Sequence, residues 1–263
     1  MPAHFNSGIC QKSDAQAIPP RPLCSTDGSP GEFISDQDSS RRRFLQMAMV
    51  GTLAGLGTAA GMEFASPGPA LAQSPLSPGA ALQELMDGNR RFTSGRLTAH
   101  EQDLAILKQH TLEKQEPFAA VLSCADSRVP VEFLFDQSIG HVFVARVAGN
   151  VVTPEIIASL EYGAAVLGTK VILVMGHGSC GAVKATIQAK EVPGQISALY
   201  PHIQPAVDQA GPNLDSTIKA NAKIQAALLR EASTVISGLV KENKLKVAAA
   251  YYDIGSGAVT ILE

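Results

Sequence analysis

Two short stretches of this sequence place thiols beside other ionisable side chains, directly after apolar runs. Cys124 follows the run Phe118–Ser123, whereas His177 and Cys180 follow the run Val171–Met175. Thiolate and imidazole are ligands that zinc prefers, and three protein ligands with an open fourth position are typical of a catalytic zinc rather than a structural one. The residue types therefore predict a zinc centre at Cys124, His177 and Cys180, with one Zn²⁺ per chain.

Asp126 and Arg128 extend the first stretch and allow two interpretations. The Asp126 carboxylate could complete the zinc tetrahedron, or Arg128 could hold it away from the metal through a bidentate pair. Held off the metal and ionised, Asp126 could accept a hydrogen bond from zinc-bound water and orient it. An isolated pair of this kind would be a surface salt bridge of little energetic value. Because the pair stands beside Cys124, we expect Asp126 and Arg128 to be catalytic.

The elements expected around these residues alternate between strands and helices. Apolar runs predict strands at 118–123, 141–147 and 171–175, and a terminal hairpin with strands at 245–252 and 258–262. Periodicity and boundary residues predict helices from Ser77-Pro78 to Ser94-Gly95 and at 101–109, 154–167, 181–190, 215–230 and 234–241. Such alternation predicts an α/β fold: a mainly parallel central sheet with an antiparallel edge hairpin and helices on both faces. In open α/β sheets, ligand sites form beyond the carboxyl ends of the strands, where Cys124, His177 and Cys180 would meet.

The bulk composition fits one ordinary globular domain. The chain has 263 residues, of which 45% are hydrophobic, and a formal net charge of −3. That length allows a sizeable core. The near-neutral balance, without a basic stripe interleaved with aromatic residues, gives no reason to expect nucleic acid as a partner.

Residues 1–72 differ in composition from the rest of the chain. Residues 1–39 are rich in Pro, Ser, Gly and Asp, which predicts disorder. The following segment holds, in order, Arg41-Arg42-Arg43-Phe44-Leu45, an uncharged small-residue stretch at 46–62, and Ala70-Leu71-Ala72. This is the order of an export signal with its cleavage site, and the arginines before Phe-Leu resemble the twin-arginine signature. A transmembrane anchor is the alternative, although Gly, Ala and Thr make the stretch only weakly hydrophobic.

We therefore expect residues 1–72 to form a disordered region with a signal peptide and residues 73–263 to form the mature domain. Its destination would be a periplasm or, in a photosynthetic cell, a thylakoid lumen. Cys10 and Cys24 would be lost with the leader, leaving Cys124 and Cys180. Two cysteines in an exported protein could form a disulfide. Their ionisable neighbours favour a metal site instead, and a route that carries folded proteins would allow the thiolates to bind metal before export.

Taken together, Cys124–Pro130 ("CADSRVP") and Gly176–Val183 ("GHGSCGAV") resemble the two signature blocks of the β-class carbonic anhydrases. The likeness runs from about Leu82 to Leu262. It implies zinc bound by Cys124, His177 and Cys180, with Asp126 and Arg128 as a catalytic dyad. It also implies reversible hydration of carbon dioxide to bicarbonate and a proton, in a homodimer or larger homo-oligomer whose active sites lie at subunit interfaces. Hydrolysis of carbonyl sulfide or carbon disulfide on the same site, and a non-catalytic zinc protein, are the alternatives.

The β-class carbonic anhydrases, which this sequence resembles, have two arrangements, or plans, of the active site. In the closed plan the aspartate that corresponds to Asp126 binds the zinc, and in the open plan it stays off the metal. The closed plan needs a tryptophan three residues before the first cysteine, where this chain has Val121 and no tryptophan anywhere. The open, plant-like plan has a glutamine, a phenylalanine and a tyrosine at positions that correspond to Gln115, Phe143 and Tyr162. The resemblance thus implies an open site, with Gln115 donating its amide N–H to substrate and two rings lining a dry pocket. A solvated loop for Gln115 and plain packing for the rings are the ordinary alternatives.

Overall fold

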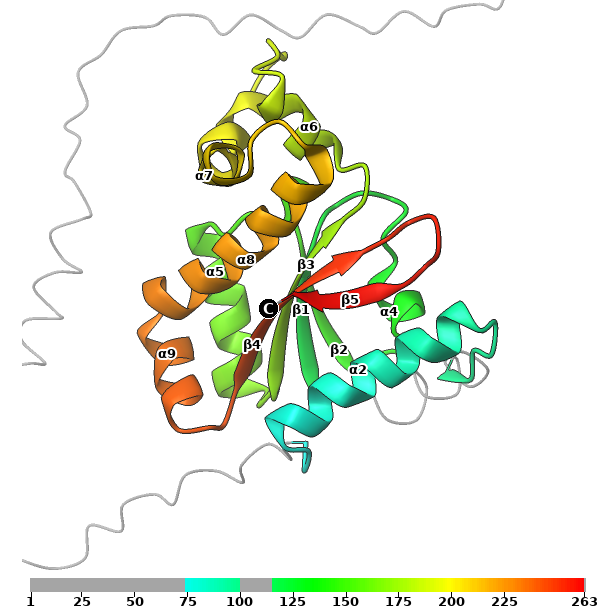
Figure 1. Ribbon diagram of the computed structural model, residues 1–263. Coiled ribbons are helices and arrows are strands. Elements are labelled where there is room, and N and C mark those ends of the chain that lie inside the picture. The colour runs from blue at the N-terminus through cyan, green and yellow to red at the C-terminus, as the bar shows by residue number, and fades with distance from the viewer. Residues whose placement is uncertain (1–73, 100–114, 263) are drawn as a thin grey trace, which may run out of the picture. The chain divides into compact units, whose positions relative to one another are not determined.

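The computed structural model describes residues 74–99 and 115–262 (Figure 1). The expected leader over residues 1–72 and the expected helix at 101–109 lie outside the described residues. Within the described ranges, no helix is both long and apolar enough to cross a membrane.

A five-stranded sheet with strand order β2-β1-β3-β4-β5 forms the centre of the domain. The first four strands in this order run parallel, and β5 pairs antiparallel with β4 at the edge. Every residue of β1 and β3 is buried, which explains their continuous apolar sequences, because parallel strands are covered on both faces. The predicted fold class is confirmed. The strands are β1 (Ala119–Ser123), β2 (Val142–Arg146), β3 (Val171–His177), β4 (Lys246–Tyr252) and β5 (Val259–Leu262).

Helices cover both faces of the sheet, with α2 on one side and α5, α8 and α9 on the other (Figure 1). Alternate strand residues serve the two faces: Val121 and Leu173 pack with Leu85 of α2, whereas Leu122 and Val174 belong to the cluster that contains α8 residues. Burying such large apolar side chains contributes about 1.5–3 kcal/mol each. The helices are α2 (Pro78–Thr93), α5 (Pro154–Glu161), α8 (Leu214–Ala232) and α9 (Thr234–Lys241).

The start of α2 shows how local chemistry sets an element boundary. Ser77 is the N-cap, and its hydroxyl accepts a hydrogen bond from the Ala80 amide at 3.2 Å. Pro78 follows in the first turn, where its missing N–H costs nothing. These boundary residues explain why the sequence predicts this helix well.

The carboxyl end of the sheet carries three further elements: the short helix α4 (Val131–Leu134) after β1, α6 (Gly181–Ile187) after β3, and then α7 (Tyr200–Ala210). Helix α6 is three residues shorter than expected. Helix α7 has no counterpart among the expected helices, because Pro205 inside it breaks the sequence pattern of a helix. Residues of α6, α7 and α8 form one apolar cluster with Cys124 and Cys180.

Two other boundaries differ from expectation. Strand β3 continues two residues beyond Met175, so His177 is the last residue of the strand rather than part of the following loop. The expected helix 154–167 divides into α5 and a π-helical turn, η3 (Tyr162–Val166), whose wider turn precedes Gly168 at φ +76°. Because His177 is the last residue of β3, the strand fixes the direction in which its side chain points.

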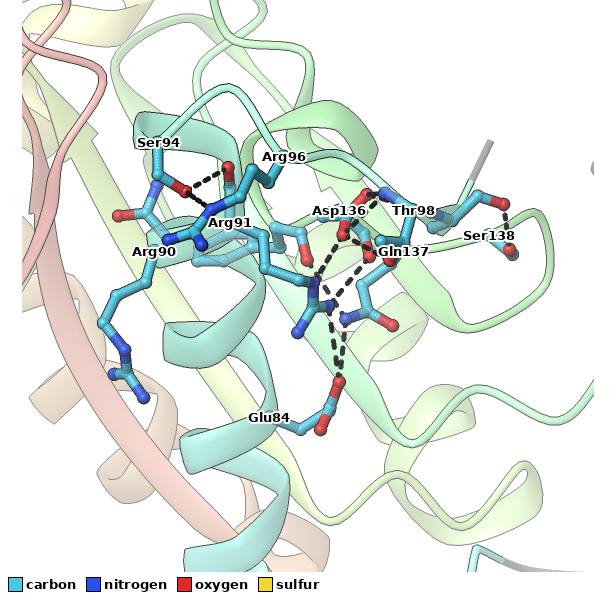
Figure 2. A network of polar contacts seen from close by, with 12 residues as sticks. Glu84, Arg90, Arg91, Ser94, Arg96, Thr98, Asp136, Gln137 and Ser138 are labelled. Carbon is cyan, nitrogen blue, oxygen red and sulfur yellow. Dashed lines mark hydrogen bonds and ion pairs between the residues drawn. The ribbon is translucent and has the colours of Figure 1, made fainter. Parts of the chain in front are cut away.

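A buried carboxylate, that of Asp136, fastens α2 to the loop that follows α4 (Figure 2). The Arg91 Nε donates to Asp136 Oδ2 at 2.5 Å, and the amides of Thr98 and Ala99 donate to Oδ1 at 2.9 and 3.0 Å. The Ser138 hydroxyl donates to the Ala99 carbonyl at 2.7 Å. These contacts hold residues 98–99 and the loop after α4 against the end of α2.

Candidate metal centre

Cys124, His177 and Cys180 meet at the carboxyl edge of the sheet, as the strand pattern predicts. Cys124 directly follows β1, His177 ends the neighbouring strand β3, and Cys180 is the N-cap residue of α6. Their ligand atoms all lie within 4.8 Å of one another, and the residues are only 5%, 0% and 1% exposed. Both cysteines are free thiols in this structure. The arrangement is a closely spaced set of two sulfurs and one imidazole.

The His177 ring presents an unpaired nitrogen in this cluster. Its Nδ1 lies 2.9 Å from the Gly178 carbonyl oxygen, which can only accept, so Nδ1 carries the proton and Nε2 has a free lone pair. Nε2 is buried and has no hydrogen-bond partner among the described residues. A buried polar atom without a partner is costly unless something else binds it. The donor set and the bare Nε2 fit a divalent metal ion such as zinc.

The surroundings of Cys124 favour its thiolate. Contact with the Cys180 thiol, then with His177 and with the Gly149 amide, lowers the pKa of Cys124 despite burial. The same thiol contact, together with burial, raises the pKa of Cys180. The Gly149 N–H donates to the Cys124 sulfur at 3.3 Å. A thiolate is the form that binds a metal, so Cys124 is poised to do so.

Asp126 forms a bidentate ion pair with Arg128 beside this cluster. Arg128 Nε and Nη2 donate to Asp126 Oδ1 and Oδ2 at 2.9 and 2.8 Å, and the Arg128 amide donates to Oδ1 at 2.9 Å. These hydrogen bonds, led by that of the guanidinium, hold the pKa of Asp126 well below its usual range. Its Oδ2 lies 3.9 Å from His177 Nε2. An ionised carboxylate therefore borders the metal cluster while its two oxygens are engaged by Arg128.

The comparisons with known proteins agree with this geometry. Residues 119–259 match the family model described as carbonic anhydrase. A carbonic anhydrase of Mycolicibacterium smegmatis is 35% identical over 193 residues, which cover 70% of this chain and 93% of the relative. Carbonic anhydrase 2 of Mycobacterium tuberculosis is 31% identical over 196 residues, with the same two coverages. The chain belongs to the carbonic anhydrase family.

Solved structures place it in the β class. The β-carbonic anhydrase of Coccomyxa, solved with acetazolamide, superposes with a TM-score of 0.54 at 26% identity, covering 69% of this chain and 86% of that one. A β-carbonic anhydrase of the fungus Aspergillus fumigatus has the same fold, with a TM-score of 0.56 at 23% identity, covering 70% of this chain and 90% of that chain. The chain is thus an enzyme of the carbonate dehydratase type. Its membership of this family supports hydration of carbon dioxide as the reaction.

Arg146 has a contact role in this carbonic anhydrase that sequence reasoning did not assign. It ends β2, opposite Ser123, and its Nε donates to the Cys124 carbonyl at 3.0 Å. Its Nη2 donates to the Asp126 carbonyl at 2.5 Å. Arg146 thereby holds the backbone at Cys124 and at Asp126, on both sides of Ala125. Only the pairing of β1 with β2 reveals this, because 22 residues separate Arg146 from Cys124.

The three expected pocket residues lie away from the metal cluster within one chain of the enzyme. Gln115 is exposed and precedes β1, whereas Cys124 follows it. Phe143 pairs with Ala120 near the start of the strands, so about 13 Å of strand separates that level from Cys124. Tyr162 is 47% exposed, and its ring centroid lies 6.5 Å from that of Phe143. The structure brings the two rings together, but it does not bring them to the cysteines.

Proposed function

We propose that this protein is a zinc-dependent carbonic anhydrase that interconverts carbon dioxide and bicarbonate, with Cys124, His177 and Cys180 as the ligands of one zinc per chain. The observation that carries the proposal is the buried Nε2 of His177, which has a free lone pair beside two sulfurs. Cys2His is a ligand set of the kinds that zinc prefers, and it leaves a fourth position open for chemistry. Bound zinc supplies a Lewis acid that lowers the pKa of a coordinated water to about 7.

In this proposal Asp126 is a catalytic residue that orients the attacking water. Its carboxylate stays ionised because Arg128 lowers its pKa, so Oδ2 can accept a hydrogen bond over a wide pH range. Arg128 also keeps both oxygens engaged, which disfavours the closed plan in which the carboxylate itself becomes a metal ligand. Asp126 and Arg128 thus act as a dyad, one accepting the hydrogen bond and the other fixing the acceptor.

We also propose that a second copy of the chain completes the substrate pocket. Gln115, Phe143 and Tyr162 lie at the other end of the sheet from Cys124, so a role in the pocket requires that they come from a partner subunit. The large exposed fraction of Tyr162 fits a surface that a partner covers. A β-carbonic anhydrase of Sordaria macrospora with this fold is described as tetrameric, which supports a homo-oligomer in general.

The test of the proposed function is a stopped-flow hydration assay on the purified protein with its metal content measured in parallel. We expect one zinc per chain and carbon dioxide hydration that stops when a chelator removes the metal and returns with zinc. Assaying carbonyl sulfide with the same preparation addresses the alternative hydrolase. A metal-free protein with full hydration activity, or a metallated one active only on carbonyl sulfide, would overturn the proposal.

A further inference from the structure

Two buried amide side chains on α8, those of Asn221 and Gln225, hold the segment that follows β2. Asn221 Nδ2 donates to the Gly149 carbonyl at 2.9 Å, and Gln225 Oε1 accepts from the Val152 amide at 2.7 Å. The two side chains are one helical turn apart and are joined to each other by a Gln225 Nε2 to Asn221 Oδ1 hydrogen bond of 3.2 Å. Both residues are only 1% exposed. The segment 149–152 is therefore fastened at both ends to α8.

The segment that these amides hold is the one whose N–H contacts the ligand sulfur. Gly149 donates to Cys124 Sγ from a backbone in the left-handed region, at φ +74°. Asn150 follows at φ +45°, which is uncommon for a residue with a Cβ and carries a conformational cost. Two successive residues in this region need external restraint, and the described structure supplies it through α8. Release of the Gly149 carbonyl would allow the segment to relax and the N–H to turn from the sulfur.

Gly149 is also confined by its neighbours. A Cβ on Gly149 would lie 2.8 Å from Ile203 Cδ1 of α7 and 3.3 Å from Ala182 Cβ of α6. Gly149 is thus packed closely against α6 and α7, and the peptide groups on its two sides are held by hydrogen bonds, one from its N–H to the Cys124 sulfur and one from Asn221 to its carbonyl. Packing alone does not account for the contact between the Gly149 N–H and the Cys124 sulfur. The side-chain amide of Asn221 also holds the Gly149 carbonyl.

We propose that Asn221 is a positioning residue for the metal ligand Cys124, acting through Gly149, with Gln225 as its support. The inference rests on the proposed function, in which Cys124 binds zinc. Hydrogen bonds to ligand atoms orient them and tune their donation to the metal, and loss of such partners typically lowers metal affinity 10–100-fold. A buried amide 97 residues along the chain from the ligand thereby sets how the thiolate meets the metal.

The experiment compares wild type with Asn221→Leu, which keeps the approximate volume and removes the donor. The first readout is zinc affinity, from competition with a chromogenic chelator. The second is the thiolate-to-metal charge-transfer absorption of the cobalt(II)-substituted protein. We expect the zinc dissociation constant of Asn221→Leu to rise 10–100-fold. We expect the cobalt band to move to lower energy, because a thiolate that has lost its N–H partner gives up electron density more easily.

Thr217→Val is the matched control. Thr217 is fully buried one turn earlier on α8, but its hydroxyl donates to the carbonyls of Gly211 and Asn213 at 2.8 Å, away from Gly149. This variant should keep the wild-type zinc affinity and band position. Should Asn221→Leu fail to fold, Gln225→Met removes the next link, and it should shift both readouts in the same direction by a smaller amount.

The outcomes separate the two proposals. A wild-type protein that binds neither zinc nor cobalt through thiolate would remove the proposed function, and this inference with it. A wild type that binds both, with folded Asn221→Leu and Gln225→Met variants unchanged in affinity and spectrum, would overturn the inference alone. Equal losses in the Asn221 and Thr217 variants would also overturn it, because they would show a general effect of altering the buried face of α8.

Discussion

At the scale of single residues, neighbouring side chains of the candidate metal centre differ in their hydrogen bonds and therefore in what they can bind. His177 offers a bare nitrogen because its other ring nitrogen donates to Gly178, and Cys124 offers a stabilised thiolate because Gly149 and the neighbouring ligand groups favour it. Asp126, two positions beyond Cys124, forms an ion pair with Arg128. Under the proposed function, metal binding and the orientation of the attacking water are therefore separable by substitution.

Cys180→Ser should remove both zinc and activity. A serine hydroxyl does not ionise near neutral pH, so the site would keep two ligands of the three. Since loss of an outer partner alone costs 10–100-fold, loss of a ligand should lower hydration by more than about 100-fold. Zinc content by mass spectrometry and stopped-flow hydration measure the two effects. A purified variant that stays metallated and active would show that Cys180 is not a ligand.

Asp126→Asn should separate the chemistry from the metal. The amide keeps the shape of the carboxylate but loses the charge that, under the proposed function, orients the attacking water. We expect zinc content to stay at the wild-type level while hydration falls by about 100-fold or more, the usual contribution of a positioned acid–base group. Loss of zinc together with activity would instead identify Asp126 as a metal ligand.

At the scale of elements, the site depends on contacts that join segments far apart in the sequence. Arg146 of β2 holds the carbonyls of Cys124 and Asp126, which follow β1, and α8 holds the segment after β2. The Asp136 network performs the same task at α2 and at the loop after α4 (Figure 2). The strands bring Cys124, His177 and Cys180 to one edge of the sheet, and these polar contacts fix the conformation of the loops there.

The stability conferred by Asp136 should depend on pH. Burial opposes its ionisation, but Arg91 and the amides of Ala99 and Thr98 outweigh burial and lower its pKa from 3.8 to about 2. Because the folded-state value is depressed, the contribution is fully present above the unfolded value and is lost as the pH falls from about 4 through about 2. The shift corresponds to about 2 kcal/mol for this fully buried carboxylate.

Asp136→Asn should therefore lower the free energy of unfolding by about 2 kcal/mol at pH 7 and by progressively less as the pH approaches 3. Urea unfolding of chelator-treated wild type and variant at several pH values measures this difference without a contribution from metal loss. Asp208→Asn, at an exposed position on α7, is the control and should stay within about 0.5 kcal/mol of wild type. A difference between Asp136→Asn and wild type that is constant with pH would contradict the assignment.

At the scale of the whole molecule, the separation between Gln115 and Cys124 makes the subunit arrangement testable. Gln115→Ala should lower activity about tenfold, the value of one lost hydrogen bond to substrate. A mixed dimer of one Gln115→Ala chain and one Cys180→Ser chain should recover about half the wild-type activity if Gln115 acts across the interface. One of its two sites would then carry both changes, and the other would carry neither.

Differently tagged chains, co-expressed and purified through both tags, provide this mixed dimer. If Gln115 acted within its own chain, every site would carry one of the two changes. The mixed dimer would then be no more active than the Gln115→Ala homodimer. That result would reject the shared pocket without bearing on the zinc ligands.

The leader expected over residues 1–72 gives a second prediction at this scale. Replacing Arg41 and Arg42 by lysine should leave an unprocessed precursor in the cytoplasm, because the twin-arginine signature is read through its arginines. Fractionation and the mass of the purified protein test this. The unaltered chain should be found beyond the inner membrane with its N-terminus near Gln73. Normal processing of the lysine variant would argue against this route.

Local sequence pattern predicts the mainly parallel sheet, the boundaries of α2 and the grouping of three residues of the metal-ligand type. Apolar runs and capping residues act over a few neighbouring positions, so strands at 118–123 and 171–175 and a helix start at Ser77 could be predicted from local pattern, whereas the extension of β3 to His177 could not. Cys124, His177 and Cys180 could be grouped because each stands at or just beyond a strand end, and parallel strands end at one edge.

How those three side chains are held depends on contacts between segments that are distant in the sequence. The bare Nε2 of His177, the Gly149 contact to sulfur and the contacts of Arg146 depend on pairing between strands. Asn221 lies 72 residues from the Gly149 carbonyl that it holds, and in the sequence it is one polar position on an amphipathic helix. Hydrogen bonds of this kind leave no local pattern, because their partners are set by how α8 packs on the sheet and not by neighbouring residues.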